Sequence, residues 1–254
     1  MTLELALVAA ASFVAGLVDS IVGGGGLILL PSLFAAYPGV VPATLLGTSK
    51  CAGVWGTAMA AFHYSRRVDL QWRWLMPAAL AALIGAFCGA WTVTQVDPTF
   101  LRKLLPVLLF AVLMYTLFNR NLGLHHAPSR GPRSTMVIAM GIGVVIGWYD
   151  GFFGPGTGSF FIFLLVRLLG FDFLNASAAA KVLNVTTNVA ALTLLASQGH
   201  VWWQVGLTLA VANVIGSVVG THLAVRHGAS LVRRVFLVVV SALILKTTYD
   251  AFMQ

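Results

Sequence analysis

The sequence predicts an all-α polytopic membrane protein built from two five-segment repeats. Three observations support this prediction: apolar segments fill almost the whole chain, two glycine-rich breaks interrupt them, and the two halves match at a constant spacing. Of the 254 residues, 59% are apolar and only 9% are charged. This composition is typical of proteins that cross a membrane several times.

The apolar segments fall into five on each side of a short polar stretch. The first repeat, 1–118, contains segments near 3–22, 27–38, 43–64, 74–94 and 101–118. The second repeat, 134–254, contains segments near 134–153, 157–169, 174–197, 204–224 and 232–252. Between them, 119–133 is interpreted as a cytoplasmic linker. The first segment lacks the basic flank of a signal peptide, so we expect it to remain as a span.

Glycine-rich breaks separate the first two segments of each repeat, at 19–26 and at 150–158. Glycine destabilises a helix and exposes its backbone, and unpaired backbone inside a membrane is tolerated only within protein or beside a polar cavity. The segment after the first break has roughly 11 residues, or about 16 Å of helix, which is too short for a core of about 30 Å. The breaks therefore predict a site near the middle of the membrane, formed by broken crossing helices or by re-entrant hairpins.

An internal repeat is indicated by the constant spacing of matching residues. Asp19 matches Asp150 and Lys50 matches Lys181, and both differences equal 131 (150 − 19 and 181 − 50). If the chain reverses at each break, nearly all the arginines of the loops fall on one side of the membrane. The positive-inside rule then favours inverted repeats, with both termini outside the cytoplasm.

Several other classes of protein are disfavoured. The net charge of +8 comes from basic residues spread over short loops, which indicates membrane orientation rather than nucleic-acid binding. Cys51 and Cys88 have no paired spacing, so we expect neither a metal nor another cofactor. We do not expect an enzyme, because the sequence has no cluster of metal ligands and no activated nucleophile. The expected partners are a small anion and the lipid bilayer, and a homo-oligomer is left open.

The candidate site combines helix starts with buried charges. Bare backbone N–H groups at a helix start bind anions, and a lysine within an apolar segment usually has a partner or faces a cavity. The candidates are, for backbone donors, Gly24, Gly25, Gly26, Gly156, Thr157 and Gly158; for charge neutralisation, Lys50 and Lys181; for orienting the ligand, Thr48, Ser49, Asn184 and Asn188; and for gating or coupling, Asp19 and Asp150.

The lysines and aspartates have an alternative interpretation. Asp19 could pair with Lys50, and Asp150 with Lys181, in ion pairs that only lock helices of the same half together. Buried charges often pair in this way without any further role.

The break motifs resemble those of the sulfite exporter TauE/SafE family. The first is Gly16-x-x-Asp19-Ser20 running into four glycines, followed by Gly47-Thr48-Ser49-Lys50; the second half repeats this order as far as Lys181-x-x-Asn184. The resemblance covers nearly the whole chain and implies an anion permease of bacterial, archaeal or plant membranes for sulfite, sulfoacetate or related anions. Family members commonly have a serine after the second aspartate, where this chain has Gly151, so no hydroxyl ligand is expected there.

Together, the residues and the resemblance predict a carrier of small sulfur-containing anions in a bacterial inner membrane. We expect an exporter that binds its anion at mid-membrane and works by alternating access. The alternative is a proton- or sodium-coupled carrier of another small organic substrate, with Asp19 or Asp150 as the coupling residue.

Overall fold

The computed structural model describes residues 3–93 and 131–252, and these residues form helices without any strand. The helices are α1 (Leu3–Val22), α2 (Gly26–Ala36), α3 (Pro42–Ser65), α4 (Trp72–Val93), α6 (Pro132–Phe152), α7 (Thr157–Leu169), α8 (Phe173–Ser197) and α9 (Trp203–Phe252). Within the described residues, five helices are long and apolar enough to cross a membrane, and α2 and α7 are shorter apolar helices. The predicted fold class, an all-α polytopic membrane protein, is confirmed.

The helix bounds follow the predicted segments closely. The segment predicted at 101–118 and most of the linker at 119–133 lie outside the described residues. The segments predicted at 204–224 and 232–252 belong to one element, α9, which is interrupted at Gly228. Gly228 has a φ of 68°, a left-handed conformation that glycine adopts without steric cost.

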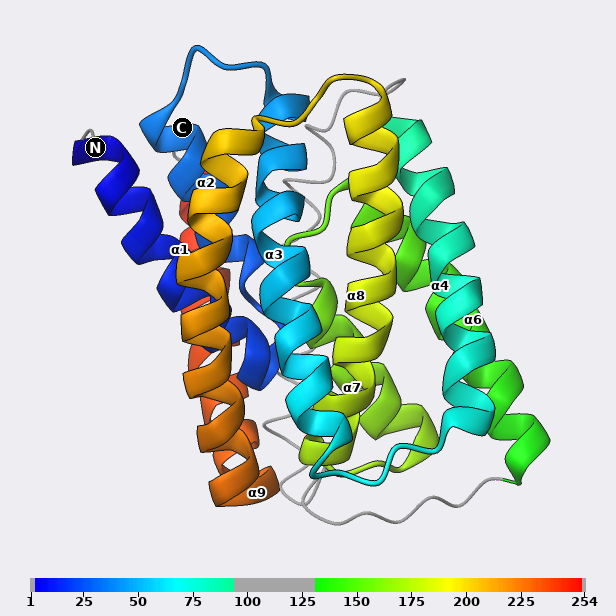
Figure 1. The fold of residues 1–254 in the computed structure, drawn as a ribbon. Helices are drawn as coiled ribbons and strands as arrows, with labels where there is room; N and C mark the ends of the chain where they lie inside the picture. Colours follow the sequence, from blue (N-terminus) through cyan, green and yellow to red (C-terminus); the bar gives the residue numbers. More distant parts are fainter. Residues whose placement is uncertain (1–2, 94–130, 253–254) are drawn as a thin grey trace.

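Each glycine-rich break is the turn of a hairpin. In Figure 1, α2 runs back toward the end of the molecule where α1 begins, and α7 runs back toward the end where α6 begins. Of the two forms that the sequence left open, the described residues therefore adopt the hairpin. The α1–α2 and α6–α7 hairpins start from opposite ends of the molecule (Figure 1).

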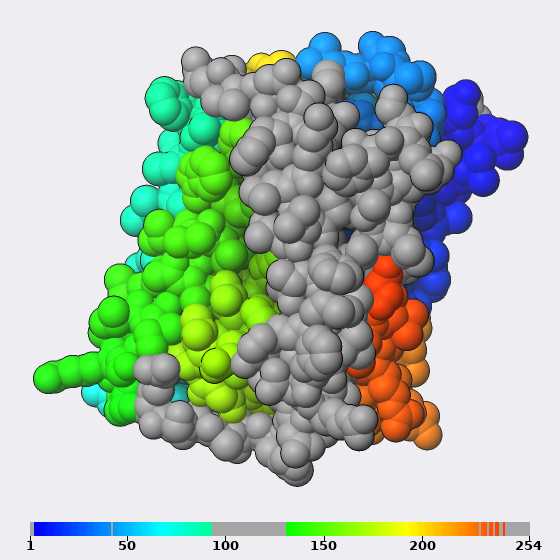
Figure 2. All heavy atoms as spheres, turned by 180° about the vertical axis from the view of Figure 1, so that it is seen from behind, coloured from blue at the N-terminus to red at the C-terminus, as the bar shows by residue number. Residues whose placement is uncertain are grey.

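The two halves of the chain interleave. α1 packs along α9, and α6 packs along α4, so the first helix of each half lies against a late helix of the other half. Seen from behind, α6 and α1 lie at opposite edges of the molecule (Figure 2).

The closest approaches in this packing are at glycines. A Cβ atom at Gly85 would lie 2.3 Å from the carbonyl oxygen of Val144, and one at Gly216 would lie 2.0 Å from that of Phe13. These contacts correspond at the spacing of the repeat, because 216 − 85 and 144 − 13 both equal 131. Matching helices run in opposite directions in Figure 1, as inverted repeats would; the inverted repeat itself stays a prediction.

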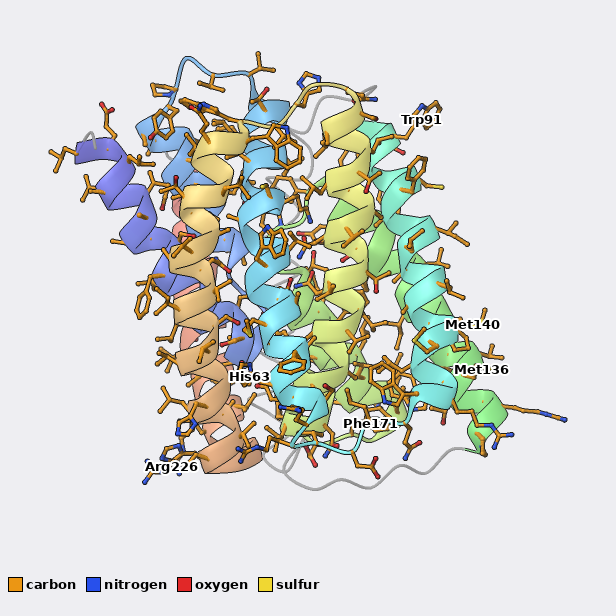
Figure 3. The ribbon with its side chains drawn as sticks, viewed as in Figure 1. His63, Trp91, Met136, Met140, Phe171 and Arg226 are labelled. Atoms are coloured by element: carbon orange, nitrogen blue, oxygen red, sulfur yellow. The ribbon has the colours of Figure 1, made fainter. Side chains whose placement is uncertain are left out.

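The outer surface of the bundle is apolar and its basic residues gather at one end. Met136 and Met140 of α6 and Trp91 of α4 lie on the outside of the bundle (Figure 3). The α3–α4 connection, the start of α6, the end of α7 and the interruption of α9 share one end of the molecule (Figure 1). These segments and the residues next to them contain the described arginines Arg66, Arg67, Arg73, Arg133, Arg167 and Arg226, and Arg233 and Arg234 follow further along α9.

We expect Gly143→Ala to destabilise the fold, because the new Cβ atom would lie 2.5 Å from the carbonyl oxygen of Ala78 on α4. Overpacking of this kind costs about 1–3 kcal/mol. Gly141→Ala on the same helix is the matched control, since nothing lies within 4 Å of its Cβ position, and alanine there should be neutral or stabilising by up to about 1 kcal/mol. Thermal unfolding followed by circular dichroism in one detergent measures both, and equal stability of the two variants would contradict the close α4–α6 contact.

Candidate functional site

A cavity of about 60 Å³ lies where the two hairpins meet α3, α8 and α9. One water needs about 10–15 Å³ of cavity volume measured in this way, so the cavity has room for roughly four to six waters, or a small anion in their place. Its lining residues include Asp19, Gly25, Gly26, Ser49, Lys50, Thr57, Asp150, Phe153, Pro155, Thr157, Gly158, Asn184, Asn188 and Asn213.

The first glycine-rich break touches the start of α7 beside this cavity. A Cβ atom at Gly23 would lie 2.2 Å from the backbone of Gly158, and Gly23 itself has a φ of 79°. Only glycine therefore fits at this crossing. The first turns of α2 and α7 both border the cavity and carry partial positive charge. The N–H groups of Leu27, Ile28 and Thr157 already donate to the carbonyl oxygens of Gly24, Gly25 and Gly154.

Two buried ion pairs connect the halves. Lys50 Nζ of α3 lies 2.8 Å from Asp150 Oδ2 of α6, and Lys181 Nζ of α8 lies 3.0 Å from Asp19 Oδ2 of α1. The alternative interpretation of the sequence paired Asp19 with Lys50 and Asp150 with Lys181, within each half. That choice of partners is therefore wrong. The halves interleave, so α1 and α6 each end beside a lysine of the other half.

The end of α1 is held by side chains from three other helices. The carbonyl oxygens of Ser20, Ile21 and Val22 accept hydrogen bonds from Tyr64 (3.0 Å), Ser177 (2.6 Å) and Ser159 (2.9 Å), respectively. The ammonium group of Lys181 donates to the Asp19 carbonyl oxygen as well as to its carboxylate. The last carbonyls of a helix lack partners within the helix, and these four receive partners from outside it.

Most of the predicted site residues line the cavity, but four do not. Lys181 is fully buried behind Asp19, and Gly24, Gly156 and Thr48 are absent from the lining. Thr48 donates to the carbonyl oxygen of Thr44 (2.6 Å) and accepts from the N–H of Trp202 (3.0 Å). It therefore attaches the start of α9 to α3.

The asparagines differ in the groups that they can offer a ligand. Asn184 accepts a hydrogen bond on Oδ1 from Thr187 (3.4 Å), which leaves its amide N–H groups as the donors for the cavity. Asn188 donates to Thr57 (3.4 Å), and these two residues are themselves 131 apart. The contact between α3 and α8 therefore joins corresponding positions of the two halves.

Asn213 is a cavity residue that the sequence analysis missed. It is buried on α9, and its amide nitrogen donates to the Ser12 carbonyl oxygen of α1 at 3.0 Å. The available signal was a lone asparagine within the apolar segment 204–224. Thr57 is likewise buried at the cavity. In the sequence it was recognisable only as a weak polar counterpart of the asparagines on α8.

Comparison with known proteins identifies the family. Residues 8–247 match the model of the family described as "Sulfite exporter TauE/SafE". The chain belongs to this family. No solved structure matches this TauE/SafE chain.

Curated relatives of this TauE/SafE protein have the names of transporters. It is 37% identical to "Probable membrane transporter protein ORF9" of Sinorhizobium sp over 97% of this chain and 93% of the relative. It is 32% identical to "Probable membrane transporter protein" of Haemophilus influenzae, over 97% and 95%, and 35% identical to "Probable membrane transporter protein YfcA" of Escherichia coli K12, over 96% and 89%. The protein is a membrane transporter of this family rather than an enzyme.

Three ionisable residues line the cavity of this TauE/SafE protein: Asp19, Lys50 and Asp150. With Lys181 behind Asp19, the two lysines and two aspartates sum to a formal charge of zero. In the ranges 3–93 and 131–252, no group of three or more histidine, cysteine, aspartate or glutamate residues could hold a metal ion. The polar side chains of the cavity lining are an ammonium group, two carboxylates, amides and hydroxyls.

We expect Lys181→Met to destabilise the protein by about 3 kcal/mol, because it leaves the carboxylate of Asp19 without its counter-ion and removes one donor from the end of α1. Chemical unfolding in detergent measures the loss. The double variant Asp19→Asn with Lys181→Met should lose less than the sum of the two single variants. Additive losses would show that the two side chains do not stabilise each other.

Proposed function

We propose that this TauE/SafE transporter exports small sulfur-containing anions, such as sulfite, sulfoacetate or related compounds, across a bacterial inner membrane. One observation supports this proposal above the others: the ammonium group of Lys50 and the first turns of α2 and α7 border one small buried cavity. Helix starts and a lysine are both sources of positive potential. A buried cavity with them is suited to an anion of a few heavy atoms.

In this proposal the anion binds between the helix starts and Lys50. Backbone N–H groups near Gly26 and Gly158, and the amide of Asn184, donate hydrogen bonds to its oxygens, while Ser49, Thr157 and Asn188 border it. Lys181 does not contact the anion; it acts through Asp19 by holding the end of α1. This assigns the two lysines different tasks, although they occupy corresponding positions.

Alternating access would proceed by movement of one half against the other about the site. In the present structure an aromatic contact lies at each end of the molecule. Tyr37 meets Trp202 at the α8–α9 connection with ring centroids 5.2 Å apart, and Trp74 meets Phe171 near the α7–α8 connection at 5.3 Å. Both contacts would have to separate in turn for the cavity to open first to one side and then to the other.

The proposed direction is outward. If the end rich in arginine faces the cytoplasm, as the positive-inside rule favours, both chain termini lie in the periplasm. An interior-negative potential then drives each negative charge outward by about 2.3 kcal/mol per 100 mV. Export of an anion with net charge therefore needs no other source of energy.

A proton- or sodium-coupled carrier of another small organic substrate is the second candidate. It is favoured by the position of Asp19 and Asp150, whose carboxylates both line the cavity. Flux that follows an imposed proton or sodium gradient, with no inhibition by sulfur anions, would support this candidate instead.

The experiment is efflux of radiolabelled sulfite from proteoliposomes at an imposed interior-negative potential, with sulfoacetate, sulfate and chloride as competitors. We expect protein-dependent efflux that increases with the potential and is inhibited by sulfoacetate but not by chloride. Absence of flux with correctly folded protein would reject the proposed function.

We expect Lys50→Met to reduce sulfite efflux at limiting concentration by about 10- to 100-fold, since a hydrogen bond to a charged group contributes about 1.5–3 kcal/mol. Arg226→Met is the control cation, because Arg226 is exposed on α9 and lies at the end of the bundle, away from its centre (Figure 3). Equal loss of efflux in the two variants would remove Lys50 from the proposed binding site.

A further inference from the structure

The two ion pairs occupy corresponding positions but are held differently. Asp19 accepts a hydrogen bond on Oδ1 from the N–H of Gly25 (3.3 Å), and Lys181 donates to both its carboxylate and its backbone carbonyl. Asp150 Oδ2 is buried and 2.8 Å from Lys50 Nζ, and none of the residues that the structure describes gives it a well-aligned hydrogen bond. Among the described residues, the first pair is held at several atoms, and the second by one contact between opposite charges.

The difference is present in the sequence around the two breaks. The hydroxyl donors at the end of α1 are Tyr64, Ser159 and Ser177. The positions 131 residues away from them are Leu195 (64 + 131), Ile28 (159 − 131) and Leu46 (177 − 131). These apolar side chains have no donor group, and Leu46 and Leu195 pack together with Leu30 instead. Among the described residues, these positions give the end of α6 no hydroxyl donor corresponding to those that hold the end of α1.

Few charged groups face Asp150. Lys50 approaches from α3, and the neighbouring Tyr149 directs its hydroxyl to the carbonyl oxygen of Pro155 at 2.6 Å. On α4, the helix packed along α6, the backbone of Ala86 and Ala90 lies against Gly151.

The remaining helices around Asp150 supply polar but uncharged groups. From α7, Thr157 donates its hydroxyl to the Gly154 carbonyl oxygen at 2.6 Å. From α8, Asn184 and Asn188 line the cavity, and Lys181 forms its ion pair with Asp19. Lys50 is thus the single cation next to Asp150 among the residues described around the cavity.

We propose that Lys50 changes its partner when an anion binds. Lys50 leaves Asp150 and pairs with the anion, and Asp150 then takes up one proton from solution. The reason is electrostatic: a buried carboxylate that loses its counter-ion is costly, and the neutral acid is then the favoured form. One proton is added to the Asp150 carboxylate for each anion bound, and no other bond changes. Asp19 keeps its contacts with Lys181 and Gly25 throughout.

This inference rests on the proposed function and adds the coupling of anion transport to a proton. A carrier with this exchange moves one proton together with each sulfur anion, in the same direction. A dianion such as fully ionised sulfoacetate still carries one net negative charge in the complex, so the membrane potential continues to drive its export. Asp150 is then the coupling residue, and Asp19 is a positioning residue.

The test is the number of protons taken up when the detergent-purified, full-length protein binds sulfoacetate. Between pH 6 and 8.5 this probe keeps both of its charges. Calorimetry in two buffers with different protonation enthalpies counts the protons. We expect about one proton per bound sulfoacetate, and an affinity that falls by up to about tenfold for each unit of rising pH, since a proton bound with the ligand links affinity to pH in that direction.

Three variants identify the residue. Asp150→Asn should bind sulfoacetate without proton uptake and without this pH dependence, and Asp150→Glu should restore both. Asp69→Asn is the control, because Asp69 is an exposed carboxylate in the α3–α4 connection, and it should behave as the wild type. If Asp150→Asn does not fold, the wild type and Asp150→Glu still decide through their proton count and pH profile.

Two results would overturn the exchange: sulfoacetate binding by the wild type without proton uptake, or an Asp150→Asn variant that still takes up one proton per anion. These differ from failure of the proposed function, in which the wild type binds neither sulfoacetate nor sulfite. In that case the exchange is rejected together with the function on which it rests.

Discussion

The structure depends on satisfying the backbone where α1 ends inside the bundle. The last carbonyl groups of α1 need partners there, and hydrocarbon offers none. Tyr64, Ser159 and Ser177 provide them for carbonyls 20–22 from α3, α7 and α8. Lys181 of α8 adds a donor to the Asp19 carbonyl, which also accepts from the N–H of Gly23. The same four contacts bring these three helices around the first hairpin, and other residues of α3, α7 and α8 line the cavity.

Much of this arrangement could be predicted from the sequence, because apolar length and glycine punctuation act locally. The helix bounds and the position of the breaks follow from the segments near 3–22 and 134–153 and from the glycines after them. Which aspartate meets which lysine could not be predicted. A repeat spacing shows that Lys50 and Lys181 correspond, but it does not show that each lies beside the other half's aspartate.

The roles of single polar side chains were equally hard to predict. Thr48 and Ser49 are neighbours of similar chemistry, yet Thr48 holds Trp202 while Ser49 lines the cavity. Asn213 contributes to the cavity from the segment 204–224, which has no glycine-rich break, because α9 is brought there by its packing along α1. Such assignments depend on the contacts between distant helices, and no local pattern encodes them. The glycine contacts, by comparison, recur at the spacing of the repeat, whereas the hydroxyl donors do not.

The cross-half pairing also sets an order of events during synthesis. Asp19 and Lys181 are 162 residues apart, and ribosomes add about 5–20 residues per second. The carboxylate of the first helix therefore exists for roughly 8–30 s before its cation has been made. During that time α1 has neither Lys181, Ser159 nor Ser177 at its end, and a charged helix end of this kind is costly in lipid. The end of α1 therefore obtains these partners only after α7 and α8 have been made.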